Sequence, residues 1–150
     1  MIVKALSSDA TSITQVALIS KAYWGYSEAQ ILSWTDELTV SPEMIQEMQV
    51  YVWKEGQKIL GFYVLNQPLD NKIELEFLFV LPSFIGKGIG KKLLVHAIEI
   101  AKKNPENLLM TLDADPNAAP FYSSQGFQTV GQKNSSIFGR FMPKMSLPLH

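Results

Sequence analysis

The sequence predicts an α/β protein of the α+β type, in which helices pack on a mixed β-sheet. Segments with the apolar pattern of strands are interspersed with segments whose apolar residues recur at helical spacing. The order over 73–113 is strand, turn, helix, strand, which favours a right-handed crossover between parallel strands. A composition of 47% hydrophobic and 18% charged residues rules out a disordered chain. The length of 150 residues is that of one ordinary domain, so a single domain, 1–150, is expected.

The N-terminal half is expected to hold a short strand, helices and a hairpin. Residues 2–6 are predicted as the strand. Apolar residues at helical spacing predict a first helix, which Asp9 or Thr11 caps and Gly25 ends. Ser41-Pro42-Glu43 has the cap residue, proline and acid that are typical of a helix start. The expected second helix covers about 27–36, and the hairpin strands cover 49–53 and 59–65.

The C-terminal half is expected to hold a central strand, two helices and three further strands. Residues 73–80 alternate, which places Ile73, Leu75, Phe77 and Phe79 on one face and Glu74, Glu76, Leu78 and Val80 on the other. Residues 108–113 are interpreted as a fully apolar strand, and Asp115-Pro116 as the start of a short helix that Gly126 closes. The remaining elements are a helix over about 88–103 and strands near 127–132 and 140–147.

Composition and charge exclude several classes of protein and site. The chain has no cysteine and only two histidines, which excludes a disulfide scaffold and thiolate zinc, and no metal is expected. No run approaches the ~20 apolar residues of a membrane span, and the N-terminus turns polar too early for a signal peptide. We therefore expect a cytoplasmic protein without a membrane partner. The net charge of −1 argues against a nucleic-acid partner.

The sharpest functional signal is the glycine-rich turn at 85–92, Ile-Gly-Lys-Gly-Ile-Gly-Lys-Lys. Its three alternating glycines let the backbone approach a ligand, and the following helix start offers N–H groups to an anion. Its three lysines replace the acids that a helix start prefers, an arrangement that a pyrophosphate would offset. A flexible turn with solvated lysines is the alternative. No P-loop spacing is present, whereas a dinucleotide site with Asp113 on a ribose remains open.

Two segments together resemble the signatures of the GNAT superfamily of N-acyltransferases. Phe79-Val80-Leu81-Pro82 followed by Gly86-Lys87-Gly88-Ile89-Gly90 resembles its acyl-CoA signature. The stretch 115–122, Asp-Pro-Asn-Ala-Ala-Pro-Phe-Tyr, followed by Gly126-Phe127, resembles its second signature, usually N-x-x-A-x-x-F-Y-x-x-x-G-F. The order of elements is also similar along nearly the whole chain. The resemblance implies a GNAT-like, mostly antiparallel mixed sheet of about six to seven strands, about four flanking helices and a central parallel strand pair.

The resemblance also implies an acyltransferase with acetyl-CoA as acyl donor, lying between strands 74–80 and 108–113. Strand backbone groups would pair with the pantetheine arm, the glycine turn would hold the pyrophosphate, and an N–H near Leu78 would stabilise the oxyanion. The implied contacts with acetyl-CoA are Leu78, Phe79, Val80, Gly86, Lys87, Gly88, Ile89, Gly90, Lys91, Asn117 and Phe121. Ile85 stands where the family usually has Gln or Arg. Trp24-Gly25-Tyr26 and Gly139-Arg140 are similar to a group of small bacterial members of undefined substrate.

The implied reaction is direct attack of an amine on the thioester in a ternary complex, and two protons must move. An amine with a pKa of ~10.4 is neutral in only about one molecule in 10³ at pH 7. Glu76, with Glu74 beside it, is the candidate base acting through water, and a solvated strand residue is the alternative for each. Tyr122 matches the family's tyrosine and is the candidate acid for the leaving thiolate, with a core aromatic as the alternative.

The acceptor is expected to be a primary amine of a small molecule or of a protein. Trp24, Tyr26 and Glu74 are the candidate acceptor contacts, together with Trp34, although aromatic residues on such helices are more often core. A cationic acceptor is mildly favoured, since residues 1–75 carry 5 basic and 9 acidic side chains and residues 76–150 carry 8 and 5. The sequence names no acceptor and leaves a homodimer open.

Several assignments have a structural alternative or a rival function. Asn117 contacts either the CoA arm or the helix start, His96 is interpreted as structural, and Asp113 and Asp115 as strand-end and cap residues. A non-catalytic acyl-CoA-binding module of the same fold is one rival function. An RNA-binding sheet is another, because Gly61-Phe62-Tyr63-Val64 resembles an aromatic recognition strand, but the charge opposes it.

Overall fold

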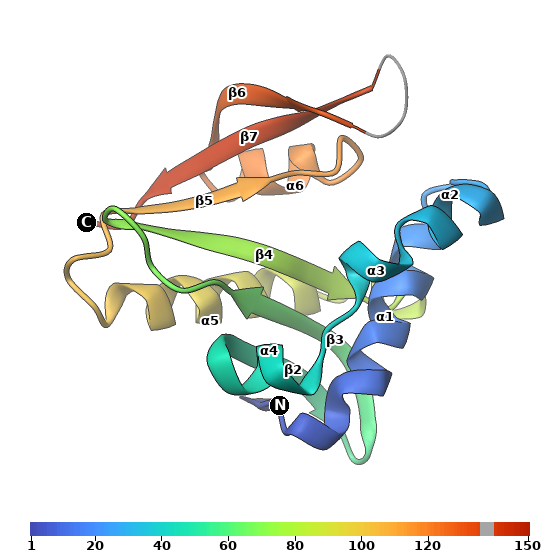
Figure 1. Ribbon diagram of the computed structural model, residues 1–150. Coiled ribbons are helices and arrows are strands. Elements are labelled where there is room, and N and C mark those ends of the chain that lie inside the picture. The colour runs from blue at the N-terminus through green and yellow to red at the C-terminus, as the bar shows by residue number, and fades with distance from the viewer. Residues whose placement is uncertain (136–139) are drawn as a thin grey trace. The chain divides into compact units, whose positions relative to one another are not determined.

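The computed structural model describes residues 1–135 and 140–150, so Gly139 of the predicted Gly139-Arg140 pair lies outside the described residues (Figure 1). The chain divides into two compact units, Met1–Leu65 with Phe77–Ala97 and Asn66–Glu76 with Ile98–His150. Strand β4 (Lys72–Val80) and helix α5 (Ile89–Lys102) each contribute residues to both units. The expectation of a single domain stays a prediction.

Seven strands form a mixed sheet in the order β1-β2-β3-β4-β5-β7-β6. The β4–β5 pair is parallel, and the pairs β1–β2, β2–β3, β5–β7 and β6–β7 are antiparallel, which confirms the predicted sheet. The other strands are β1 (Ile2–Lys4), β2 (Gln49–Glu55), β3 (Lys58–Leu65), β5 (Leu109–Asp113), β6 (Gln128–Asn134) and β7 (Phe141–Pro148).

The described residues form six α-helices, against the four or so expected. Besides α5 they are α1 (Ala10–Ala22), α2 (Glu28–Ser33), α3 (Thr35–Leu38), α4 (Pro42–Glu47) and α6 (Ala119–Ser124). The expected helix over 27–36 is divided because Trp34, with φ −98° and ψ 1°, ends α2 and precedes α3. Ser41 caps α4 as predicted, its Oγ accepting a hydrogen bond from Met44 N at 3.1 Å. No described helix has the length and apolar character needed to cross a membrane.

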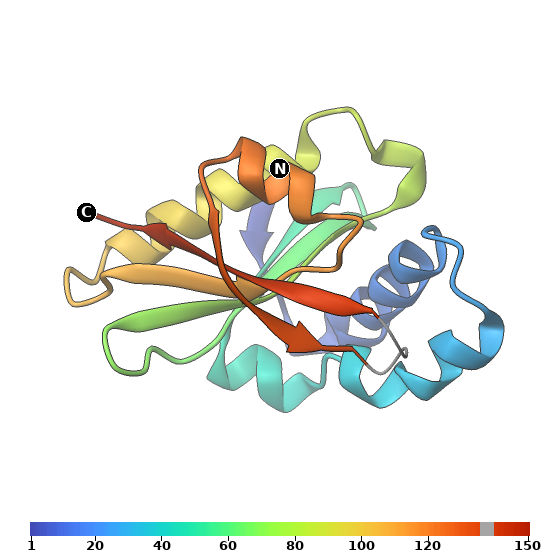
Figure 2. The same ribbon diagram turned by 90° about the horizontal axis from the view of Figure 1, so that it is seen from above.

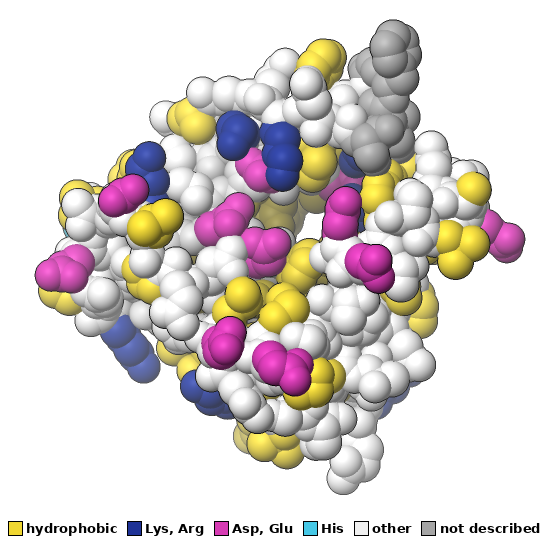
Figure 3. Space-filling view, viewed as in Figure 1, with side chains coloured by type: hydrophobic (Ala, Val, Ile, Leu, Met, Phe, Trp, Pro, Cys, Tyr) yellow, Lys and Arg dark blue, Asp and Glu magenta, His cyan; other side chains and the backbone are white. Residues whose placement is uncertain are grey.

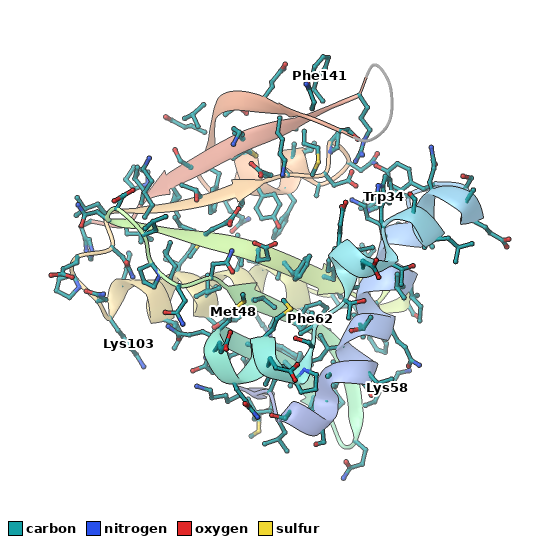
Figure 4. All side chains as sticks on the ribbon, viewed as in Figure 1. Trp34, Met48, Lys58, Phe62, Lys103 and Phe141 are labelled. Carbon is teal, nitrogen blue, oxygen red and sulfur yellow. The ribbon has the colours of Figure 1, made fainter. Side chains whose placement is uncertain are left out.

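In the first unit, β3 is the centre of the core. Its residues from Ile59 to Leu65 are all buried. Helix α1 lies on one face of β2 and β3, and the first part of α5 lies on the other (Figures 1 and 2). Phe62, labelled in Figure 4, packs its ring 5.9 Å from that of Phe79, measured between centroids. The Phe77 and Phe79 rings are also 6.0 Å apart, which confirms that these two residues share a face of β4.

Gly61 of β3 lies where a side chain would collide with backbone. A Cβ at this position would lie 2.8 Å from the carbonyl oxygen of Phe79 and 3.1 Å from Cδ1 of Leu93. We expect Gly61→Ala to lower the free energy of unfolding by about 1–3 kcal/mol, because a strand carbonyl cannot rotate away. Chemical denaturation measures this, with Gly131→Ala as control, since a Cβ at Gly131 has no neighbour closer than 3.7 Å. Equal stability of the two variants would contradict the prediction.

In the second unit, strands β5, β7 and β6 carry helix α6 on one face (Figures 1 and 2). Strand β5 begins at Leu109 and alternates, with Met110 and Leu112 buried and Leu109, Thr111 and Asp113 half-buried. The expectation of a fully apolar strand over 108–113 is therefore wrong, because one side of β5 is left partly exposed. Basic side chains lie next to acidic ones over these strands in Figure 3, in keeping with the ion pairs from Lys133 and Lys144 to Asp113.

Candidate active site

Two glutamates on one face of β4 are held together by an asparagine. Asn66 Nδ2 donates hydrogen bonds to Glu74 Oε1 at 2.8 Å and to Glu76 Oε2 at 2.5 Å. The backbone N–H of Asn66 also donates to the carbonyl of Glu74 at 2.9 Å, which fixes the asparagine opposite this part of the strand. Acidic side chains are visible at the surface over β4 in Figure 3. The predicted pair of carboxylates thus forms one cluster.

The cluster changes the acid strength of Glu76. Glu76 is an exposed residue, but partial removal of its carboxyl from water raises the pKa above its ordinary value of 4.5, and the neighbouring charge of Glu74 raises it further. The hydrogen bond from Asn66 and the positive charge of Lys133 on β6 act in the opposite direction, lowering the pKa. The net effect is a carboxylate that is more basic than an ordinary glutamate, which suits a proton acceptor near neutral pH.

Tyr122 lies on α6 with its ring in the core, and its hydroxyl makes no hydrogen bond to the described residues. The ring centroid is 5.3 Å from that of Phe121 and 5.7 Å from that of Phe127, and the residue is 7% exposed. No residue in the described part of the chain hydrogen-bonds to the hydroxyl. Burial raises the pKa of the phenol above 10, so the hydroxyl keeps its proton at neutral pH and can donate it.

The turn that leads into α6 differs from the predicted helix start. The helix begins at Ala119, not at Asp115-Pro116, because Asp115 closes a turn before it. Asp115 Oδ1 accepts hydrogen bonds from both N and Nδ2 of Asn117 at 2.9 Å, so this asparagine contacts the turn before the helix, and its contact with the CoA arm stays a prediction. Asp115 Oδ2 pairs with Arg140 Nη2 at 3.0 Å. Gly126, with φ +97°, follows the end of α6 as predicted.

The glycine turn before α5 has the conformation that its glycines predict. Gly86 and Gly88 have φ of +84° and +81°, values that side chains rarely allow, and a Cβ at either would have no neighbour within 4 Å. Helix α5 begins at Ile89 without an acid in its first turn. Lys87 Nζ lies 5.4 Å from the ring centroid of Phe84. Ile85, at the position where the GNAT superfamily usually has Gln or Arg, is 47% exposed.

The C-terminal end of β4 carries the other predicted acyl-CoA contacts, Leu78, Phe79 and Val80. Pairing between β4 and β5 extends from Lys72–Leu109 to Glu74–Thr111, whereas β4 continues to Val80. The carbonyl of Val80 accepts a hydrogen bond from Ser20 Oγ at 2.9 Å. A carbonyl oxygen can accept two hydrogen bonds, so this contact leaves one acceptor position at Val80.

The aromatic residues near the start of the chain form two separate pairs. Trp24 is 39% exposed and packs against Tyr23, with ring centroids 5.2 Å apart. Tyr26 packs at 4.9 Å against Trp34, labelled in Figure 4. Lys21 Nζ lies 5.5 Å from the Tyr26 ring centroid and 5.2 Å from that of Trp34, so an intramolecular ammonium occupies this pair. Of the predicted acceptor residues, Tyr26 and Trp34 therefore contact each other, whereas Trp24 belongs to the other aromatic pair.

Two residues have contacts that sequence reasoning missed. Asn66 was not among the predicted site residues, and the signal that could have found it is its position directly after the strand that ends at Leu65, in the connection to the next strand. No partner of His96 could be named from the sequence; its Nδ1 is 2.7 Å from the hydroxyl of Tyr63, and its ring centroid is 4.8 Å from that of Tyr51. His96 thus has a structural role in the first unit, as interpreted, with defined partners.

Comparison with known proteins gives concordant similarities. Residues 25–146 match the family described as an acetyltransferase (GNAT) domain. The chain is 29% identical over 131 residues to the peptidyl-lysine N-acetyltransferase YiaC of Escherichia coli, covering 87% of this chain and 84% of that protein. Its structure is similar to PaiA N-acetyltransferase from Thermoplasma acidophilum in complex with coenzyme A, with a TM-score of 0.82, 25% identity and coverage of 99% and 98%. It is also similar in fold to yncA from Salmonella typhimurium with its cofactor acetyl-CoA, with a TM-score of 0.71, 23% identity and coverage of 100% and 94%.

Proposed function

This chain belongs to the GNAT acetyltransferase domain family, and from that premise we propose that it acetylates a cationic primary amine by direct attack in a ternary complex. The chain is an N-acetyltransferase, and acetyl-CoA is its acyl donor. The resemblance carried by the two signatures is confirmed, and the rival of a non-catalytic acyl-CoA-binding module is not favoured. The acceptor and the residues of the site are the proposed part.

The observation that carries the proposed acceptor is the cluster of Glu74 and Glu76 around Asn66. Two carboxylates side by side attract an ammonium ion, and the raised pKa of Glu76 makes this carboxylate a better proton acceptor. A protein lysine and a small polycation both present such an ammonium. The relative YiaC is a peptidyl-lysine N-acetyltransferase, which supports testing lysine peptides beside small amines.

The proposed reaction moves two protons. Glu76 takes one proton from the bound ammonium through water, and the neutral amine nitrogen then bonds to the acetyl carbonyl carbon. As the carbon–sulfur bond breaks, the Tyr122 hydroxyl gives its proton to the departing CoA thiolate. The acylated nitrogen then loses its remaining extra proton to solvent. Glu76 releases its proton to solvent, and solvent returns a proton to Tyr122.

Acetyl-CoA is proposed to bind through the glycine turn and the end of β4. The positive φ values of Gly86 and Gly88 and the lysine-rich start of α5 support a pyrophosphate at this turn. The backbone of Phe79 and Val80 is proposed to pair with the pantetheine arm, and an N–H near Leu78 to stabilise the oxyanion. Lys87, Ile89, Gly90, Lys91, Asn117 and Phe121 complete the proposed contacts. Trp24, Tyr26 and Glu74 are proposed to face the acceptor.

Acetyl-CoA is expected to stabilise the protein against heat, whereas NAD is not. At 100 times the dissociation constant, a ligand adds about 2.7 kcal/mol to the free energy of unfolding. For a chain of this size, we expect the unfolding midpoint to rise by roughly 5–11 °C. Thermal unfolding with each ligand measures the effect, and NAD tests the dinucleotide alternative. An equal shift with NAD, or none with acetyl-CoA, would contradict the proposed donor site.

A further inference from the structure

The chain contains one arginine, and its guanidinium is largely removed from water. Among 13 basic residues, Arg140 is the only arginine. Its side chain is 15% exposed, and that of its partner Asp115 is 10% exposed. Arg140 Nη2 donates to Asp115 Oδ2 at 3.0 Å, and Nη1 donates to Ser135 Oγ at 2.7 Å. A planar guanidinium fork holds two partners in a fixed geometry, which a lysine ammonium does not.

Asp115 occupies a notable position in the second signature. When Phe121-Tyr122 is aligned with the F-Y of N-x-x-A-x-x-F-Y, the signature's asparagine falls on Asp115 and its alanine on Ala118. A neutral amide is thus replaced by a carboxylate in a largely buried position. Such a charge requires a paired cation, and Arg140 of the chain's C-terminal segment provides it.

Helix α6 depends on this turn for its position. It has six residues, a proline in its first turn and an N-terminal cap residue, Ala118, whose side chain makes no capping hydrogen bond. A helix of this length does not hold itself in place, so contacts outside the helix must position it. The carbonyl of Asp115 accepts hydrogen bonds from the N–H groups of Ala118 at 2.8 Å and Ala119 at 3.1 Å.

A short series of contacts connects Arg140 with Tyr122. Arg140 pairs with Asp115, the carbonyl of Asp115 holds Ala118, and the carbonyl of Ala118 accepts hydrogen bonds from Phe121 N at 3.0 Å and Tyr122 N at 3.3 Å. The other side of Tyr122 is held separately, because its carbonyl accepts a hydrogen bond from Phe127 N at 3.1 Å. The carbonyl of Tyr122 also accepts a hydrogen bond from Gln125 N at 3.0 Å, so the contacts that begin at Arg140 reach Tyr122 through its N–H, and the contacts of its carbonyl do not involve Arg140.

We propose that Arg140 is a positioning residue for acetyl transfer, which holds Asp115 and the turn before α6 and thereby fixes the Tyr122 hydroxyl. The inference rests on the proposed role of Tyr122 as proton donor. Loss of the guanidinium fork would let the start of α6 shift and displace the Tyr122 hydroxyl, while the ring remains buried. The expected consequence is a slower chemical step with little change in the affinity for acetyl-CoA.

A double-mutant cycle between Arg140 and Tyr122 tests the proposal. We expect Arg140→Gln to lower kcat by about tenfold in the wild-type background and by less than about twofold in the Tyr122→Phe background. Arg140→Lys keeps the cation beside Asp115 and loses the fork, so it is carried through the same cycle in case the glutamine variant does not fold. Lys144→Gln is the control, because it removes a cation from an exposed ion pair on β7.

The outcomes separate the inference from the proposed function. A smaller effect of both Arg140 variants in the Tyr122→Phe background supports the inference, since a merely structural role gives the same factor in both backgrounds. Equal factors, or no effect on kcat, overturn it. If Tyr122→Phe alone leaves kcat unchanged, the proton-donor role fails and the inference falls with it. Acetyl transfer as such would still stand if the variant forms the acetylated amine.

Discussion

Replacing Tyr122 with phenylalanine is expected to lower kcat by about 10²-fold, the lower end of the range for loss of a general acid. The change removes one hydroxyl from a ring that keeps its contacts with Phe121 and Phe127. Because no residue in the described ranges hydrogen-bonds to that hydroxyl, the unfolding midpoint should stay close to that of the wild type. Steady-state kinetics with acetyl-CoA and a saturating amine measure the effect.

The control for this variant is Tyr23→Phe, which removes the hydroxyl of a tyrosine that is 54% exposed. Its kcat should match the wild type. The stabilisation that acetyl-CoA gives to the Tyr122→Phe variant should also match the wild type, since the proposed loss concerns proton donation and not binding. A kcat within about twofold of the wild type would remove Tyr122 from the mechanism.

Replacing Glu76 with glutamine is expected to lower kcat/KM for the amine by about 10²-fold at neutral pH. In the wild type, kcat/KM should rise with pH through the pKa of Glu76, which burial and the charge of Glu74 raise above 4.5. The variant should lack this limb of the profile, because glutamine accepts no proton. The amide preserves the size of the side chain and an oxygen that can accept the hydrogen bond from Asn66.

The same substitution is expected to change stability in the opposite direction. A carboxyl whose pKa is raised by folding stabilises the folded state most at low pH, and this contribution is lost as the pH rises through the folded pKa. Glu76→Gln should therefore have a higher unfolding midpoint than the wild type at pH 7, and the difference should vanish below about pH 4. Glu99→Gln, on the exposed side of α5, is the control. A lower midpoint for Glu76→Gln at pH 7 would contradict the raised pKa of this carboxyl.

The elements that the sequence predicted well depend on local chemistry. The alternation over 73–80 places Glu74 and Glu76 on one face because successive strand residues point to opposite sides, and both are bound by Asn66 in the structure. Ser41 caps α4 through its own hydroxyl, three residues from the N–H that it accepts. Gly86 has a positive φ that few other residues adopt.

Where sequence reasoning was wrong, distant contacts had overridden local pattern. Asp115-Pro116 has the form of a helix start, yet the Asp115 carboxylate is bound by Arg140, 25 residues further along the chain, and α6 begins later. The structural role of His96 was expected, but its contact with the Tyr63 hydroxyl, 33 residues away, could not be read from the helix alone. Neither contact is visible until the strands and helices have been placed.

The sequence by itself determined the family and the fold class of this protein. The two signatures and the patterns that predict each element are local, because each depends on residues close together in the chain. The tertiary structure alone decided which polar atoms meet. Asn66 reaches two carboxylates because β4 lies beside the turn that holds it, and Arg140 reaches Asp115 because the C-terminal strands lie beside the start of α6. Burial raises the pKa of Tyr122, and partial burial together with the charge of Glu74 raises that of Glu76, and these surroundings come from packing that spacing along the chain does not specify.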